Sequence, residues 1–166
     1  MNSPALQTAH ETVATTGTTY VTFLAAGEIY GVPTASVREV LVWTPVTRIP
    51  NAGASVKGVI NLRGEIIPVL DVRLRLGLPP TDPTERTCIV VMTVRQGREK
   101  LTAGLVVDTA LEVTRLVPAQ IEGRADARLA GAHVDGVART KAGLVMLLNA
   151  DALVSDGADS PSAVRA

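Results

Sequence analysis

Short runs of Val, Ile, Leu and Thr, separated by turn residues, most limit what this chain can fold into. Examples are YVTFLAA from Tyr20 and TCIVVMTV from Thr87, and the glycines in AAGE and RQGRE supply the positive φ of hairpin turns. No run carries a 3.6-residue apolar stripe of helical length. The pattern predicts an all-β fold of small barrels or a sandwich, with short helical turns at 55–57, at 72–76 and after Asn149.

The chain also contains an internal repeat. Residues 30–41 (YGVPTASVREVL) align without a gap with residues 103–114 (AGLVVDTALEVT), a shift of 73 positions from 31 to 104. Residues 58–76 align with residues 136–154 in the same order, a shift of 78 positions from 58 to 136. The two matches predict a tandem duplication of one β unit. Units of about 70 residues are small for independent stability, so we expect them to share apolar surface, by exchanging strands, with a groove between them.

The duplication predicts one domain over residues 18–154, with a first unit at about 18–80 and a second at about 84–154. Residues 1–17 are rich in Thr and Ala and lack the charged and apolar regions of a secretory signal. Residues 155–166 are polar and contain few apolar side chains. Both terminal segments are therefore predicted to be disordered.

Charge and composition argue against several classes of partner. Lys and Arg balance Asp and Glu at 16 each, and the chain has only two Tyr, one Phe and one Trp, so nucleic-acid binding is not indicated. No apolar run is long enough to insert into a membrane. The single Cys88 favours a reducing compartment and is predicted to be a buried, inert thiol. The basic residues Arg73, Arg75 and, after a turn, Arg86 are interpreted as a solvated face beside a short helix.

A search for catalytic and metal sites finds no nucleotide, hydrolase or zinc-protease motif. His133 and Asp135 could supply two metal ligands, but zinc needs three or four, so a solvated loop histidine is the favoured interpretation. Glu65 and Asp71 share a strand face but would lie ~20 Å apart, too far for a paired-carboxylate site. We therefore expect no enzymatic activity, no cofactor and no metal.

Residues 46–73 make the sequence recognisable. The stretch VTRIPNA, followed by VKGVINLRGEIIPVLDVR and later by AGLVVDTALEVTRL, strongly resembles the CheW family of bacterial chemotaxis adaptors. The resemblance runs from about Thr19 to Leu153. It implies two small five-stranded barrels with exchanged strands, similar to SH3 or OB barrels. It also implies a non-enzymatic, cytoplasmic adaptor that couples the cytoplasmic tips of chemoreceptors to the histidine kinase CheA in membrane-associated arrays. Other CheW-like domains, assembled in rings, are a further partner that it allows.

The resemblance also assigns site residues. The receptor-binding groove would use Val37, Glu39, Val40, Gly58, Val59, Arg63 and Gly104. The valines would supply apolar contact, the two glycines would let a receptor helix approach the backbone, and Arg63 and Glu39 would form an ion pair. Kinase binding would use apolar residues near other turns, Val46 and Ile49, while Trp43 is assigned to capping a barrel core.

Arg63, Gly64 and Glu65 have Lys141, Ala142 and Gly143 as their counterparts in the second copy, so the fold itself does not require the charged triplet. This asymmetry favours a receptor-facing Arg63 over an ordinary surface ion pair beside a turn. The residues 33–35 (PTA) depart from the Asp and large aliphatic side chains that many family members carry there, which leaves the identity of the partners open. Two alternatives remain, namely a receptor-binding protein of another motility or developmental pathway that does not activate a kinase, and a small-barrel binder of ligands or nucleic acid.

Overall fold

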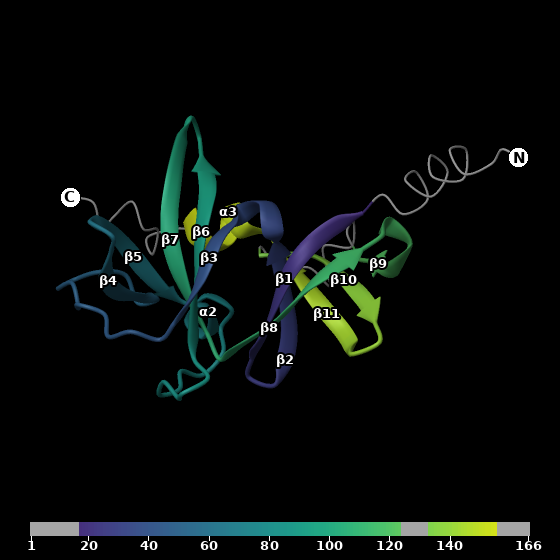
Figure 1. Ribbon diagram of the computed structural model, residues 1–166, viewed down its shortest axis with the longest axis horizontal. Coiled ribbons are helices and arrows are strands. Elements are labelled where there is room, and N and C mark those ends of the chain that lie inside the picture. The colour runs from purple at the N-terminus through teal and green to yellow at the C-terminus, as the bar shows by residue number, and fades with distance from the viewer. Residues whose placement is uncertain (1–16, 124–132, 156–166) are drawn as a thin grey trace, which may run out of the picture.

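The computed structural model describes residues 17–123 and 133–155, so most of the two terminal segments predicted to be disordered lies outside the described residues. The described strands are β1 (Thr18–Ala25), β2 (Glu28–Pro33), β3 (Val37–Val42), β4 (Val56–Leu62), β5 (Glu65–Asp71), β6 (Cys88–Gln96), β7 (Glu99–Val107), β8 (Thr109–Leu116), β9 (Ile121–Glu122), β10 (Val134–Thr140) and β11 (Gly143–Leu148). Four short helical segments join them, η1 (Thr34–Ser36), α2 (Val72–Arg75), η2 (Pro118–Gln120) and α3 (Ala150–Ser155) (Figure 1). The all-β prediction is confirmed.

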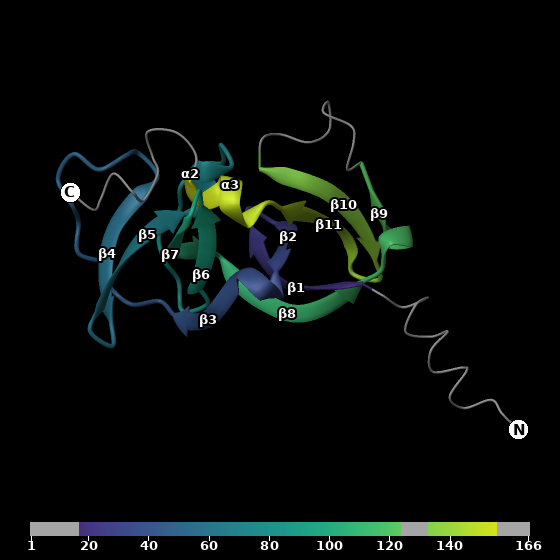
Figure 2. The same cartoon turned by 90° about the horizontal axis from the view of Figure 1, so that it is seen from above.

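The strands form two sheets that exchange hairpins. The five-stranded sheet has the order β3-β6-β7-β5-β4, and the six-stranded sheet has the order β8-β1-β2-β11-β10-β9. The β1–β2 hairpin from the first half of the chain thus lies between strands of the second half, and the β6–β7 hairpin lies between strands of the first half. Figure 2 shows the two sheets side by side. The predicted strand exchange is therefore confirmed, although the pairing order of each described sheet is open rather than a closed ring of strands.

Strand register confirms the internal repeat at the level of single residues. Gly31 of β2 lies opposite Leu147 of β11 in a parallel pair, and Gly104 of β7 lies opposite Val69 of β5 in the same arrangement. These partners differ by the two shifts found in the sequence, from 31 to 104 and from 69 to 147. A register shift also precedes Gly58 in the β4–β5 hairpin and its equivalent, Gly136, in the β10–β11 hairpin. The two copies of the sequence therefore build the same local structure.

The apolar core has one shared part and two separate parts. The largest cluster joins both sheets, with Phe23 and Val32 from the six-stranded sheet and Val90 and Leu105 from the five-stranded sheet, all 0% exposed. Two smaller clusters fill the interior of each sheet separately. Burying one large aliphatic side chain stabilises a fold by about 1.5–3 kcal/mol, so the shared cluster holds the two sheets together as one domain. This confirms the predicted sharing of apolar surface.

Local predictions had mixed outcomes. The turn at 72–76 is confirmed as α2, whose first N–H groups are capped by Asp71 (2.9 Å from Arg73 N to Asp71 Oδ1), and α3 follows Asn149 as predicted. The predicted helical turn at 55–57 is wrong, because the Ser55 carbonyl accepts a hydrogen bond from Asp71 N at 2.8 Å and β4 begins at Val56. The prediction that Cys88 is buried is also wrong, since it is only partly buried.

Candidate functional site

An ion-paired clamp joins the β4–β5 turn to β3, although β3 and β4 are the two ends of the five-stranded sheet. Arg63 occupies the turn with a φ of 53°, and the Asn61 side chain accepts a hydrogen bond from Gly64 N at 2.8 Å. Two guanidinium nitrogens of Arg63 donate to the two carboxylate oxygens of Glu39, one of them at 3.2 Å. The structure thus contains the ion pair that the sequence predicts.

A second ion pair strengthens the clamp. Arg38 Nη1 donates to Glu65 Oε1 at 3.0 Å, so neighbouring residues of β3 hold both sides of the same turn. The hydrogen bonds from Arg63 hold the pKa of Glu39 below its usual value, and the hydrogen bonds to Glu39 raise the pKa of Arg63. Both pairs are solvent-exposed, so they position the turn rather than contribute much to global stability. We call the four side chains Arg38, Glu39, Arg63 and Glu65 the turn clamp.

The valines predicted to join the clamp in one groove do not all lie on its side. A register shift between Val37 and Glu39 breaks the alternation of β3, and Val37 packs against the shared core. Leu41 packs against the interior cluster of the five-stranded sheet. Because side chains alternate along a strand, Glu39 lies on the same face of β3 as Leu41, while Val40, which is 42% exposed, points to the other face. Val59 is partly buried and forms an isolated β-bridge with Thr47, which lies outside the named strands, along the free edge of β4. The structure therefore brings Glu39 and Arg63 together, while Val37 and Val40 lie on the other face of the sheet.

Gly58 and Gly104 allow close packing within the protein itself. A Cβ on Gly58 would lie 2.1 Å from the Thr47 carbonyl oxygen, and a Cβ on Gly104 would lie 2.7 Å from Ile89 Cγ2. Both glycines are buried, and the space beside them is filled by atoms of the same chain. Each glycine therefore admits a neighbouring part of this protein, and the expectation that they also admit a receptor helix stays a prediction.

The residues predicted for kinase binding lie in the segment between β3 and β4. Val46 and Trp43 are partly buried and pack against the core of the five-stranded sheet, as expected for Trp43. Ile49 lines a surface hollow of about 450 Å³ together with Arg48, Pro50 and Asn51. Val46 thus packs mainly within the protein, while Ile49 is the better placed of the two to contact a partner.

The turn clamp has no counterpart in the second copy. The equivalent residues, Glu112 and Lys141, line a hollow of about 270 Å³ whose floor includes Ile29 and Val145. Within residues 17–123 and 133–155, no ion pair joins Glu112 to Lys141. The same fold therefore has a clamped turn in the five-stranded sheet and an open turn in the six-stranded sheet. The difference in residues was predictable from the sequence, whereas the hollow depends on the packing of the strands around it.

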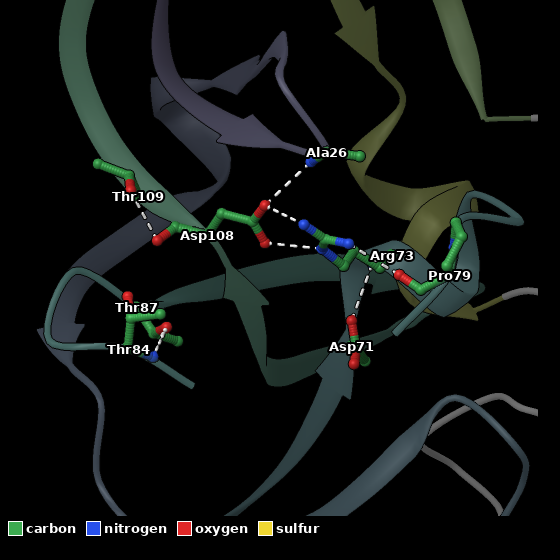
Figure 3. Close-up of polar contacts among 8 residues, drawn as sticks. All are labelled: Ala26, Asp71, Arg73, Pro79, Thr84, Thr87, Asp108 and Thr109. Atoms are coloured by element: carbon green, nitrogen blue, oxygen red, sulfur yellow. Dashed lines mark hydrogen bonds and ion pairs between the residues drawn. The ribbon is translucent and has the colours of Figure 1, made fainter. Parts of the chain in front are cut away.

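A second polar site, which sequence analysis missed, joins the two sheets (Figure 3). Asp108 stands where the chain passes from β7 to β8. Its carboxylate accepts hydrogen bonds from Arg73 Nε at 2.9 Å, from Arg73 Nη2 at 2.6 Å and from the backbone N–H of Ala26 at 2.9 Å. Arg73 also donates to the Pro79 carbonyl at 2.9 Å, and Arg75 donates to the Val154 carbonyl of α3 at 3.0 Å. Arg73 and Arg75 are therefore structural links, and the interpretation of a solvated helix face is wrong.

We call Arg73, Asp108 and the N–H of Ala26 the inter-sheet clasp. The side chains of Arg73 and Asp108 are only 16% and 24% exposed, so solvent screens their attraction less than that of the turn clamp. Hydrogen bonds from Arg73 hold the pKa of Asp108 below its usual value, although partial burial acts in the opposite direction. The clasp fixes α2 of one sheet against the β1–β2 turn of the other.

Other chemistry is sparse in the part of the chain that the structure describes. No three His, Cys, Asp or Glu side chains gather there to hold a metal ion. Among these same residues, no helix combines the length and apolar character needed to cross a membrane. The His133 carbonyl accepts a hydrogen bond from Asn149 N at 2.7 Å, which places this histidine at the start of β10 beside the entry to α3.

Comparisons with known proteins agree on one family. The family model of the CheW-like domain matches residues 19–158. The chemotaxis protein CheW of Bacillus subtilis is 29% identical over 151 residues, which cover 90% of this chain and 94% of that protein. A probable chemotaxis protein CheW of Rhizobium etli is 40% identical over 93 residues, and this match spans 57% of its length. The crystal structure of the scaffolding protein TtCheW from Thermoanaerobacter tengcongensis superposes with a TM-score of 0.75 at 29% identity, covering 87% of this chain and 96% of that one.

Proposed function

Because the chain belongs to the family of CheW-like domains, we propose that it is a chemotaxis scaffold that couples the cytoplasmic tips of chemoreceptors to a CheA-type histidine kinase. It performs no catalysis and acts by holding receptor and kinase together in the cytoplasm, beside the membrane that carries the receptors. Other CheW-like domains are further partners in the same array. The curated relatives that support this proposal carry chemotaxis names, and the related crystal structure is named as that of a scaffolding protein.

The observation that carries the proposal is the asymmetry of the two turns. A duplicated fold needs the same core in both copies, but only the first copy holds its turn against β3 with the exposed Arg63–Glu39 and Arg38–Glu65 pairs. Exposed ion pairs contribute little to stability, so packing does not account for them. A positioned, charged turn next to exposed Ile66 is suited to recognising the helical tip of a receptor.

We therefore assign Glu39 and Arg63 to receptor contact. Val37, Val40 and Val59 are apolar neighbours that contribute less, because they do not share the face of Glu39. Ile49, with the hollow that it lines, is our candidate for kinase contact. The alternative function, receptor binding without kinase activation, predicts the same receptor contact. It is distinguished by adding purified kinase, because only a coupling scaffold raises kinase autophosphorylation in receptor-containing membranes.

Reversing the charge of Arg63 should weaken receptor binding. In the Arg63→Glu variant two carboxylates face each other, so the turn is released from β3 and the affinity for receptor-containing membranes is expected to fall about tenfold, as for other interfacial charge reversals. Co-sedimentation with such membranes over a range of protein concentrations measures the change.

Two further variants sharpen this test. Lys141→Glu makes the same charge change at the equivalent turn of the second copy and should leave receptor binding unchanged. The exchange variant Arg63→Glu/Glu39→Arg restores opposite charges and should restore the turn and part of the binding. Equal losses for Arg63→Glu and Lys141→Glu would show that binding responds only to net charge, and the assignment of Arg63 would be wrong.

A further inference from the structure

The β6–β7 hairpin extends beyond the strands on either side of it (Figure 1). Its pairing with β3 ends where Val37 faces Met92, and its pairing with β5 begins where Val69 faces Gly104. The residues beyond these points pair only with each other. We call residues 93–102 the β6–β7 arm.

Internal comparison shows that the arm is longer than the duplicated fold requires. The equivalent glycines are Gly31, which faces Thr22 in the β1–β2 hairpin, and Gly104, which faces Val91. Beyond this point the β1–β2 hairpin continues for three residue pairs and the β6–β7 hairpin for five, so the arm is two pairs longer. The additional pairs are Arg95 with Lys100 and Gln96 with Glu99. The other copy folds in the same way without them.

The additional pairs place positive charges together at the end of the arm. Arg95 and Lys100 lie directly opposite each other, Arg98 occupies the turn, and all three are exposed. The ion pairs found in residues 17–123 and 133–155 involve none of these three side chains. Like charges directly opposite on neighbouring strands destabilise a hairpin. The arm thus contains a local arrangement that works against folding, which is typical of positions retained for a function.

The arm is supported on one face and open on the other. Val94 and Leu101 belong to the shared core together with Leu153 of α3, and Asp151 of α3 accepts a hydrogen bond from Arg95 N at 3.1 Å. Side chains alternate along a strand, so Arg95 and Lys100 point to the opposite face. That face also carries Thr93 and Thr102, whose hydroxyl oxygens lie 3.3 Å apart. The open face therefore displays hydroxyl groups followed by two cations, on a hairpin whose other face packs against the shared core.

We propose that the open face of the arm binds a carboxylate-rich segment of a protein partner. Carboxylates satisfy both the cations and the hydroxyl groups, and a bound segment removes the repulsion between Arg95 and Lys100. The tip residues Gln96 and Gly97 offer no apolar or aromatic side chain. A lipid surface is recognised by larger clusters of about 4–8 basic residues, and single-stranded nucleic acid by stacking aromatics, so a protein segment fits best. The proposal rests on the scaffold function, because a scaffold supplies the partners.

The Lys100→Glu variant tests the arm through two opposite effects. A glutamate opposite Arg95 turns a repulsive pair into an attractive one, so resistance to urea unfolding is expected to stay equal or to rise. The same change is expected to lower the rate of association with the partner about tenfold at low salt and much less at high salt. Stopped-flow association with a purified receptor fragment and with the purified kinase, at both salt concentrations, measures the rates.

The Arg86→Glu variant is the matched control, because it changes an exposed arginine outside the arm by the same charge. A selective loss of rate in Lys100→Glu, for either partner, supports the proposal. Normal association of Lys100→Glu with both partners overturns the role of the arm and leaves the scaffold function standing. If the wild-type protein binds neither partner, the scaffold function fails and the arm proposal fails with it. Binding of the wild-type protein, but not of Lys100→Glu, to phosphatidylserine vesicles would assign the arm to lipid and overturn a protein partner.

Discussion

Replacing Gly58 by alanine is expected to destabilise the protein by about 3 kcal/mol, from backbone strain and steric overlap together. Gly58 has a φ of 148°, a conformation that residues with a side chain rarely adopt. Its added Cβ would also lie 2.1 Å from the Thr47 carbonyl oxygen and 2.7 Å from the Thr47 carbonyl carbon. The Thr47 backbone cannot move aside at low cost, because it exchanges two hydrogen bonds of 2.9 Å with Val59. A loss of this size is a large part of the stability of an ordinary domain, about 5–15 kcal/mol.

Urea unfolding of the two proteins measures this loss as a shift of the midpoint. Gly64→Ala is the matched control, because Gly64 also has a positive φ, 89°, but has no atom within 4 Å of its added Cβ. It should therefore show only the backbone strain, about 1 kcal/mol. If the two variants lose the same free energy of unfolding, the close approach of Thr47 does not determine the requirement for glycine at position 58.

Replacing Asp108 by asparagine is expected to cost about 2 kcal/mol at neutral pH, because it leaves the partly buried Arg73 without a charged partner. With its oxygen in the place of Oδ2 the asparagine can still accept from Ala26 N and Arg73 Nη2, but its NH2 group then faces Arg73 Nε, so the third hydrogen bond and the charge attraction are lost. The Asp108 side chain is 24% exposed, which places the expected loss below the range for fully buried pairs. Glu122→Gln is the control, since it breaks the exposed Arg139–Glu122 pair and should cost less than about 0.5 kcal/mol.

The effect of Asp108 should depend on pH in a defined direction. The pKa of Asp108 is lowered in the folded protein, so the unfolded chain binds this proton more readily. The ionised carboxylate therefore stabilises the fold fully at pH values above the ordinary aspartate pKa of about 4. This contribution disappears as the pH falls through the lowered pKa of Asp108 in the folded protein. The stability difference between wild type and Asp108→Asn should close on acidification. A difference that is as large in acid as at neutral pH would contradict the proposed ionic contribution.

Sequence analysis predicted the architecture because the duplication records it twice. Gly31 and Gly104 fill equivalent positions beside parallel strands, so their spacing reflects a packing requirement of the fold. The Arg63–Glu39 pair was predicted from the family resemblance, and the absence of the charged triplet from the second copy indicated only that the fold does not require Arg63.

Features that depend on a single local irregularity were not predictable. The register shift at Arg38 places both Val37, opposite Met92, and Val40, opposite Val90, on the face of β3 away from Glu39, whereas the family resemblance placed all three in one groove. The inter-sheet clasp was missed because Arg73 and Asp108 lie 35 residues apart and neither belongs to a periodic pattern. The role of Gly58 became clear only once the path of Thr47 was known.

The exchange of hairpins also has a consequence for synthesis on the ribosome. The β1–β2 hairpin leaves the ribosome before its partners, because β8 is the eighth and β11 the last of the described strands. Until then the nascent chain displays unpaired strand edges, which can pair with other chains. Because each hairpin completes a sheet of the other half, two molecules could also complete each other without losing a native contact. The order of synthesis therefore favours exchange of hairpins between chains wherever nascent chains lie close together.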